Sequence, residues 1–344
     1  MNRVSLSKVV VVGAGIAGAT CARAMADEGL DVHVVDKARG AGGRLATRRL
    51  EWMDEERNRR MTRFDHGVPA FMADDPAFLE FLRTAFPPGA LVQWSPLAPG
   101  HKRSSGDLGP RWLPTPDMPS LCRWLLRDLT ATWSFPVDRI HRSQLGWQIE
   151  AAGATLPGHF DAVVLALPPA QAAPLLPSHR GDWAQSASHV RMQPCWTLMG
   201  VARNPVNGGV GDAGRPEDGP LAWVMRNDVR PGRESVDDEA HWVAHARPAW
   251  SAEHIEQPAT WVQAQMQAAL QDWLGEPVLW QHAVVHRWRY ATPPSSGADA
   301  GQRFWWDGAR GLGVCGDSFG CTGVEGAWQS AHALFQAMSG RQEE

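Results

Sequence analysis

The chain has 344 residues, enough for one large or two ordinary domains, and it has no apolar run long enough for a transmembrane helix. Its formal net charge is −4 and it has no long basic run, which argues against nucleic acid or an anionic membrane as a partner. Five cysteines without a Cys-x-x-Cys pair indicate reduced thiols, so we expect a cytoplasmic protein.

The start of the chain predicts a strand, a tight turn, a helix and a second strand. Residues 9–12 are four valines, typical of a buried strand, and they run directly into Gly13, Gly15 and Gly18. Gly13 permits the tight turn, Gly15 lets the backbone approach a pyrophosphate, and Gly18 lets the helix pack closely on the strand. This pattern predicts a Rossmann-type dinucleotide site.

The expected cofactor contacts continue beyond this turn. The free N–H groups at the helix start, at Ile16 and Ala17, are expected to face the pyrophosphate. Asp36 ends the second predicted strand, where an acid accepts hydrogen bonds from a ribose 2′-hydroxyl and repels a 2′-phosphate, so NADP is not expected. The glycine-rich stretch after it suits a backbone folded against phosphates, with Arg39 or Arg44 as countercharge. The alternative for this stretch is a solvated loop.

Further along, helices and strands are predicted to alternate. Residues 51–63 are charge-dense and are expected to form an exposed excursion. Helices are predicted over 76–85, with Asp75 as N-cap, and over 118–130, with a hairpin over 91–113 between them. Strands are predicted over 137–140, 147–149 and 160–166, and the last of them is expected to be buried.

From residue 190 the pattern changes to strands separated by polar loops. A helix is predicted over 260–274, closed by Gly275, and strands over 195–202, 221–225, 242–246 and 278–288. We therefore expect a mostly antiparallel sheet with a helix, distinct from the opening unit. A strand over 311–317 and a helix from 323 to 338 then repeat the strand, glycine turn and helix of the start. Two such elements at opposite ends of the chain indicate one long cofactor that spans both.

Several motifs together resemble a known superfamily. The start of the chain resembles the FAD-binding start of the flavin amine oxidases. It carries Gly13-x-Gly15-x-x-Gly18 with Asp36, followed by Arg39-Gly-x-Gly42-Gly43-Arg44. The second FAD segment of that superfamily resembles the ending Cys315-Gly-Asp317…Gly323-Val-Glu325-Gly-Ala327. The resemblance narrows to the renalase family, across nearly the whole chain, through Phe64-Asp-His-Gly67, Trp242-Val-Ala-His245 and His286-Arg-Trp-Arg-Tyr290.

The resemblance implies an α/β fold, with a discontinuous Rossmann-type FAD-binding domain of the amine-oxidase type and a second, mostly antiparallel β substrate domain. The first domain would comprise residues 1–68, 116–170 and 308–344, and the second residues 69–115 and 171–307. FAD would be held non-covalently by Gly13, Gly15, Ile16, Ala17, Gly18, Asp36, Lys37, Arg39, Gly43, Arg44, Val137, Gly316, Asp317, Gly323, Val324, Glu325 and Ala327.

Individual roles also follow from the resemblance. Asp36 would hold the adenosine ribose, Arg44 the pyrophosphate, and Val137 the adenine through its backbone. Asp317 would reach the pyrophosphate or the ribityl chain. The helix that starts near Val324 would point its positive end at the flavin pyrimidine and stabilise the anionic reduced flavin.

The resemblance also implies a substrate class. Members of the family oxidise dihydronicotinamide isomers, passing a hydride to flavin N5 and then electrons to O2, which becomes hydrogen peroxide. Loss of hydride from a dihydropyridine needs no base, only a ring held near N5 and the exclusion of water. Amine oxidases of the superfamily generally place a lysine near N5 late in the chain, whereas this chain has no lysine beyond Lys102. One departure is Pro69-Ala70, where relatives commonly have Gln-Tyr before Phe71, so the substrate can differ.

The candidate catalytic residues are His245, Trp288 and Phe71. His286, Trp288 and Tyr290 are expected to share one face of their strand, with ordinary core packing as the alternative. Two other functional classes remain open. One is a flavin amine oxidase or desaturase-like enzyme on another small substrate, and the other is an FAD-binding protein with a structural or signalling role.

Overall fold

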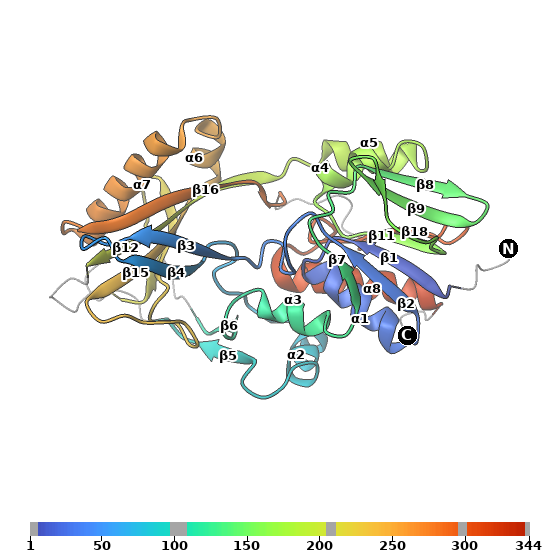
Figure 1. Ribbon diagram of the computed structural model, residues 1–344, viewed down its shortest axis with the longest axis horizontal. Coiled ribbons are helices and arrows are strands. Elements are labelled where there is room, and N and C mark those ends of the chain that lie inside the picture. Colours follow the sequence, from blue (N-terminus) through green and yellow to red (C-terminus); the bar gives the residue numbers. More distant parts are fainter. Residues whose placement is uncertain (1–5, 97–108, 204–210, 295–300, 341–344) are drawn as a thin grey trace.

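The computed structural model describes residues 6–96, 109–203, 211–294 and 301–340, which form two lobes (Figure 1). One lobe is built on a six-stranded sheet in which all neighbours are parallel except the first two. Its order is β17 (Trp305–Asp307), β18 (Leu312–Val314), β11 (Ala162–Leu165), β1 (Lys8–Val12), β2 (Asp31–Val35) and β7 (Thr130–Thr132). The first and last parts of the chain therefore meet in one sheet, as the two similar ends of the sequence predict.

The four valines of β1 explain how this sheet is buried on both faces. Because side chains alternate along a strand, Val9 and Val11 belong to one core and Val10 and Val12 to the other. The first core includes α1 (Ile16–Asp27), α3 (Ser120–Leu125) and α8 (Gly323–Ser339). The second is covered by β8 (Arg139–Ser143), β9 (Gly146–Ala151), β10 (Ala154–Thr155), α4 (Pro169–Ala172), the 3-10 turn η1 (Ala173–Leu175) and α5 (Gly181–His189).

The other lobe is a five-stranded antiparallel sheet with helices on its outer face (Figure 1). Its order is β13 (Ala213–Gly214), β14 (Leu221–Arg226), β15 (Glu239–Ala246), β12 (Gln193–Arg203) and β16 (Trp280–Thr292). After α6 (Pro248–Glu253), helix α7 (Ala259–Leu274) covers the sheet with four buried side chains spaced four residues apart: Val262, Met266, Leu270 and Leu274. The predicted α/β fold with a second, antiparallel lobe is confirmed.

Two hairpins and helix α2 (Pro76–Thr84) complete the described elements. The hairpin β5 (Leu91–Trp94) and β6 (Arg111–Pro114) was predicted, although residues 97–108 between its strands lie outside the described residues. Residues 51–63 are mostly exposed, as expected of the excursion, but they belong to a hairpin of β3 (Thr47–Met53) and β4 (Arg59–Asp65) that was not predicted. Charged side chains in this hairpin alternate with four buried ones: Leu50, Trp52, Thr62 and Phe64. The high density of charge hides this period of two in the sequence.

The helix predicted over 118–130 is also shorter than expected. It ends at Leu125, and Thr130–Thr132 joins the edge of the first sheet beside β2. Asp128 has a φ of 63°, a left-handed conformation through which a helix does not continue. Helices α4, α5 and α6 are absent from the sequence-based prediction, because they are short and lack a clear apolar period.

The predicted domain ranges remain a prediction, and some segments near their boundaries pack on the other lobe. Residues 173–187 and β17 pack within the first lobe. Trp52 of β3 instead stacks on His282 of β16, with ring centroids 6.0 Å apart. In the described ranges, no helix combines the length and apolarity needed to cross a bilayer.

Candidate functional site

A cavity of about 1150 Å³ extends from the carboxyl ends of β1 and β2 to strand β16. Typical small-molecule pockets measure roughly 300–1,000 Å³, so this one has room for a ligand of dinucleotide size. The predicted cofactor residues that line it are Gly13, Gly15, Ile16, Ala17, Asp36, Lys37, Gly43, Arg44, Val137, Gly316, Asp317, Gly323, Val324 and Ala327.

The glycine turn after β1 forms an open cradle at one point and a tight contact at another. Gly15 is the N-cap of α1, and a Cβ built there would meet only the Cα of Gly43, at 3.9 Å. A Cβ at Gly18 would lie 1.9 Å from the carbonyl oxygen of Gly13, so Gly18 serves helix–strand packing and does not line the cavity. The start of α1 therefore has open space beside Gly15, which an anion site at a helix start requires.

Asp36 stands at the end of β2, and its carboxylate is partly occupied by the backbone. It accepts hydrogen bonds from the N–H groups of Ala14 at 2.6 Å and Ala38 at 2.7 Å. A carboxylate offers about four acceptor positions, so capacity remains for a ribose hydroxyl. Val137 also lines this part of the cavity, as an adenine contact requires.

Arg44 and Asp317 form a two-pronged ion pair between the two cofactor segments. Arg44 Nη1 donates to Asp317 Oδ2 at 2.8 Å, and Nη2 donates to Oδ1. Arg44 Nη1 also donates to the carbonyl of Ala291 at 3.0 Å, and the Asp317 side chain is only 8% exposed. The sequence assigns each residue a separate cofactor contact, but in the structure each also neutralises the other.

Arg39 and Glu325 are predicted cofactor residues that the structure places outside the cavity lining. Arg39 is exposed. Glu325 accepts hydrogen bonds from the N–H groups of Asp74 at 2.7 Å and Asp75 at 3.1 Å, just before α2. Its carboxylate therefore ties the start of α8 to the start of α2.

Three rings form an aromatic corner at the β16 end of the cavity: His66, His286 and Trp288. Their centroids lie 4.6 to 5.0 Å apart, and all three residues line the cavity. The Trp288 indole N–H donates to the His66 carbonyl at 3.1 Å, which fixes the corner. Sequence reasoning gave no site role to His66, although the Phe64–Gly67 motif that contains it was the signal available. Such a corner can enclose a flat ligand ring.

The other two candidate catalytic residues lie outside the cavity lining. His245 Nε2 is 3.2 Å from the His66 carbonyl oxygen, so His245 supports the aromatic corner from the side. Phe71 is buried, exchanges backbone hydrogen bonds with Trp112 and packs on Phe78. Of the three, only Trp288 lines the cavity.

The histidines of this region are electrically neutral at neutral pH. Burial lowers the pKa of His66 to about 3, helped by the positive charge of Arg48 and by the repulsion that a protonated His286 would exert. Burial also lowers the pKa of His245 to about 4, and burial together with Arg48 lowers that of His286. Neutral imidazoles exchange hydrogen bonds with uncharged groups, so the aromatic corner suits an uncharged ring.

We expect the free energy of unfolding to fall as the pH drops from 6.5 towards 4.5. Histidines of the unfolded chain have a pKa of about 6.5 and bind protons below that pH. His66 and His245 in the folded chain stay unprotonated there, so acid favours the unfolded state. Each such histidine removes up to about 1.4 kcal/mol per pH unit in this window. Thermal unfolding at both pH values measures the loss. His66→Gln should make the loss of stability between these pH values smaller. His141→Gln, at an exposed position on β8, should leave that loss unchanged.

Comparisons with known proteins agree with the fold. Residues 11–85 match the family model described as an NAD(P)-binding Rossmann-like domain. Over 98% of its length the chain is similar to 99% of a protein assigned as a protoporphyrinogen oxidase from Exiguobacterium sp. 255-15, with a TM-score of 0.70 and 12% identity. Cyclohexylamine oxidase from Brevibacterium oxydans IH-35A gives a TM-score of 0.68 and 13% identity, over 97% of this chain and 99% of that one.

Putrescine oxidase bound to putrescine gives a TM-score of 0.59 and 16% identity, over 97% of this chain and 99% of that one. At such low identity these three likenesses concern the fold. The chain thus carries an NAD(P)-binding Rossmann-like segment within a two-lobed fold that it shares with these oxidases.

Proposed function

We propose that the chain binds FAD and is an oxidoreductase. The cavity supports this because it joins an adenosine end, at Asp36 and Val137, to the aromatic corner at His286 and Trp288. The open cradle at Gly15 and the start of α1 lie between these ends and suit the pyrophosphate. The start of α8 also lines the cavity and would place a positive helix end near the flavin.

We propose that the FAD is held without a covalent bond. Cys315 and Cys321 flank the second cofactor segment, but neither lines the cavity. Burial raises the pKa of the Cys315 thiol well above its usual value, which keeps it from reacting as a thiolate. All five cysteines are free, which supports a reducing, cytoplasmic location.

The substrate we propose is a reduced nicotinamide isomer, 2- or 6-dihydro-NAD(P). Bound FAD would supply the hydride acceptor and pass the electrons to O2, which would leave as hydrogen peroxide. The observation that carries this proposal is the neutral aromatic corner of His66, His286 and Trp288. It can hold a dihydropyridine flat and exclude water, and the reaction asks no more of the protein because no base is needed.

A second candidate is an amine oxidase or desaturase-like enzyme. Cyclohexylamine oxidase and putrescine oxidase, which share the fold, favour it. The absence of any lysine beyond Lys102 disfavours it, because the amine oxidases of the superfamily generally place a lysine near flavin N5 late in the chain.

Anaerobic stopped-flow mixing separates the two candidates. We expect 2- or 6-dihydronicotinamide isomers to bleach the flavin of the purified holoprotein, because their hydride can be held over N5. Simple amines should not bleach it, and 4-dihydro NADH should react poorly, because its hydride sits at another ring position. Rapid bleaching by an amine, with none by any dihydronicotinamide, would reverse the order of the two candidates. A holoprotein that no member of the panel reduces would favour a structural or signalling role.

A further inference from the structure

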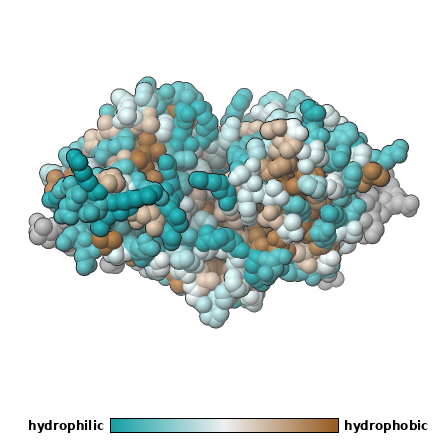
Figure 2. Space-filling model, in the orientation of Figure 1, coloured by the Kyte–Doolittle hydropathy of each residue, from teal (hydrophilic) through white to brown (hydrophobic). Residues whose placement is uncertain are grey.

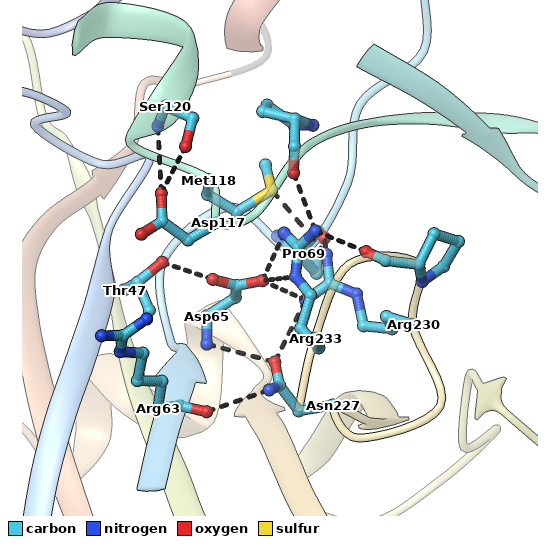
Figure 3. Close-up of polar contacts among 12 residues, drawn as sticks. Thr47, Arg63, Asp65, Pro69, Asp117, Met118, Ser120, Asn227, Arg230 and Arg233 are labelled. Carbon is cyan, nitrogen blue, oxygen red and sulfur yellow. Dashed lines mark hydrogen bonds and ion pairs between the residues drawn. The ribbon is translucent and has the colours of Figure 1, made fainter. Parts of the chain in front are cut away.

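The cavity wall at His66 and Val68 belongs to a short segment, residues 65–69, that has no regular structure beyond β4. Its backbone is held on the cavity side by Val68 N–H, which donates to the carbonyl of Arg44 at 2.9 Å. On its other side the segment meets a cluster of buried charged side chains (Figure 3). We call Asp65, Asn227, Arg230 and Arg233 the buried clamp.

Arg230 contacts both ends of this segment at once. Its Nη1 donates to the Asp65 carboxylate at 2.7 Å, and its Nη2 donates to the carbonyl of Pro69. The Arg230 side chain is fully buried, and its guanidinium also lies over the Trp94 ring, 5.4 Å from the centroid. One guanidinium thus links residues 65 and 69, while His66 and Gly67 between them donate their N–H groups to the carbonyl of Ala46 at 3.1 and 3.3 Å.

The rest of the buried clamp holds Asp65 in place. Arg233 Nε donates to the Asp65 carboxylate at 2.7 Å. Asn227 accepts from the Asp65 N–H at 3.2 Å and donates to the Arg63 carbonyl at 3.0 Å, which reproduces a strand pairing at the end of β4 (Figure 3). Burial alone would raise the pKa of Asp65. The positive charges of Arg230 and Arg233 outweigh burial and lower the pKa below its ordinary value, so the carboxylate stays ionised.

Two arginines against one carboxylate give the clamp more cationic than anionic groups in a buried place. Such a cluster is costly to desolvate, and an apolar cluster of similar volume is often as stable. Its geometry is specific, however, because planar guanidinium groups fix several acceptors at once. The clamp therefore contributes to the path of one particular segment, and that segment is the one with His66 in the aromatic corner.

We propose that Arg230 is a positioning residue for the reaction at this cavity, which it serves by holding His66 and Val68 against the bound ligands. The proposal rests on the proposed function for the identity of the reaction, but the contacts that support it do not. Sequence reasoning missed Arg230 because it is 165 residues from Asp65 along the chain and stands in a segment predicted as a loop.

The experiment compares Arg230→Met, Arg230→Lys and Arg226→Met in the FAD-loaded protein. Arg226 is the matched control, because it is also a buried arginine of the same lobe but pairs with Asp228 and donates to the Glu239 carbonyl. Three quantities are measured: amide hydrogen exchange of residues 64–71, the affinity for FAD, and the rate constant of flavin reduction separately from the affinity for the reducing substrate. The substrate is the compound of the anaerobic panel that bleaches the wild-type flavin.

Arg230→Met should speed exchange at Gly67 and Val68 by about tenfold or more and slow flavin reduction roughly 10- to 100-fold, the cost of a misplacement near 1 Å. FAD affinity should stay within about threefold, since the residues around Gly15 are untouched. Arg230→Lys should lie between Arg230→Met and wild type, because an ammonium keeps the charge but does not reach both acceptors. Arg226→Met should lower the melting temperature while leaving exchange at 64–71 and the reduction rate unchanged.

The proposal is overturned if Arg230→Met exchanges and reacts like wild type, or if Arg226→Met changes both readouts equally. If Arg230→Met does not fold, Arg230→Lys and Asn227→Ala decide, with faster exchange and slower reduction expected for both. If an amine reduces the wild-type flavin and no dihydronicotinamide does, only the proposed substrate is refuted. The reduction rates of the Arg230 variants are then measured with that amine. If no compound bleaches the wild-type flavin, unchanged exchange in Arg230→Met refutes the clamp and faster exchange supports it.

Discussion

Gly15→Val should give a folded protein that no longer retains FAD. The backbone of Gly15 has a φ of −75°, which valine adopts without strain, and a Cβ there meets only the Gly43 Cα at 3.9 Å. The two methyl groups beyond that Cβ would occupy the cradle in which we place the pyrophosphate. We expect FAD affinity to fall by roughly 100-fold or more, about 2.7 kcal/mol. Absorbance of the purified protein and titration of the apoprotein with FAD measure it.

Two other glycines make this result interpretable. Gly181→Val adds the same side chain at the start of α5, where a Cβ meets nothing within 4 Å, and should leave FAD binding unchanged. Gly18→Val should instead destabilise the fold, because its Cβ would overlap the Gly13 carbonyl oxygen. A yellow Gly15→Val protein with wild-type FAD affinity would contradict the placement of the pyrophosphate at this turn.

The parts of the fold that could be predicted are those encoded locally. The strand at residues 9–12 and the helix start at Ile16 were placed to within one residue, because valines and glycines follow one another without interruption. Helix α7 was predicted equally well from its own apolar spacing and from Gly275, which has the left-handed φ of 70° expected of a helix end. The β3–β4 hairpin was not, because its alternation is hidden by charged side chains.

The cavity lining was predictable around the glycine turn and Asp36 and much less so near strand β16. The Gly15 cradle and Asp36 lie within one βαβ unit, whereas the aromatic corner is made by residues 66, 286 and 288. Nothing in a single sequence states that His66 meets strand β16, or that Arg230 bridges Asp65 and Pro69. Such contacts depend on sheet register and on how the two lobes meet, so they need the structure.

Arg44→Met should weaken FAD binding strongly, and Asp317→Asn in the same chain should restore about half of the lost binding free energy. Removing Arg44 leaves the Asp317 carboxylate, 8% exposed, without its ion-pair partner beside the place of the pyrophosphate. The loss of the Arg44 cation removes an attraction for the negatively charged pyrophosphate, and the unpaired Asp317 carboxylate repels it. We expect a loss of about 100-fold, near 2.7 kcal/mol. Titration of each apoprotein with FAD measures it.

The double variant separates the two causes. If the unpaired carboxylate causes about half of the lost binding free energy, Arg44→Met/Asp317→Asn should bind FAD about tenfold more tightly than Arg44→Met, because asparagine keeps the hydrogen-bonding shape without the charge. If Arg44 acts only through its own contact with the pyrophosphate, the double variant should bind as poorly as Arg44→Met. Asp317→Asn alone should change affinity little, since it frees the Arg44 cation while removing one acceptor. A single variant Arg44→Met with wild-type affinity would mean that neither member of the pair faces the cofactor.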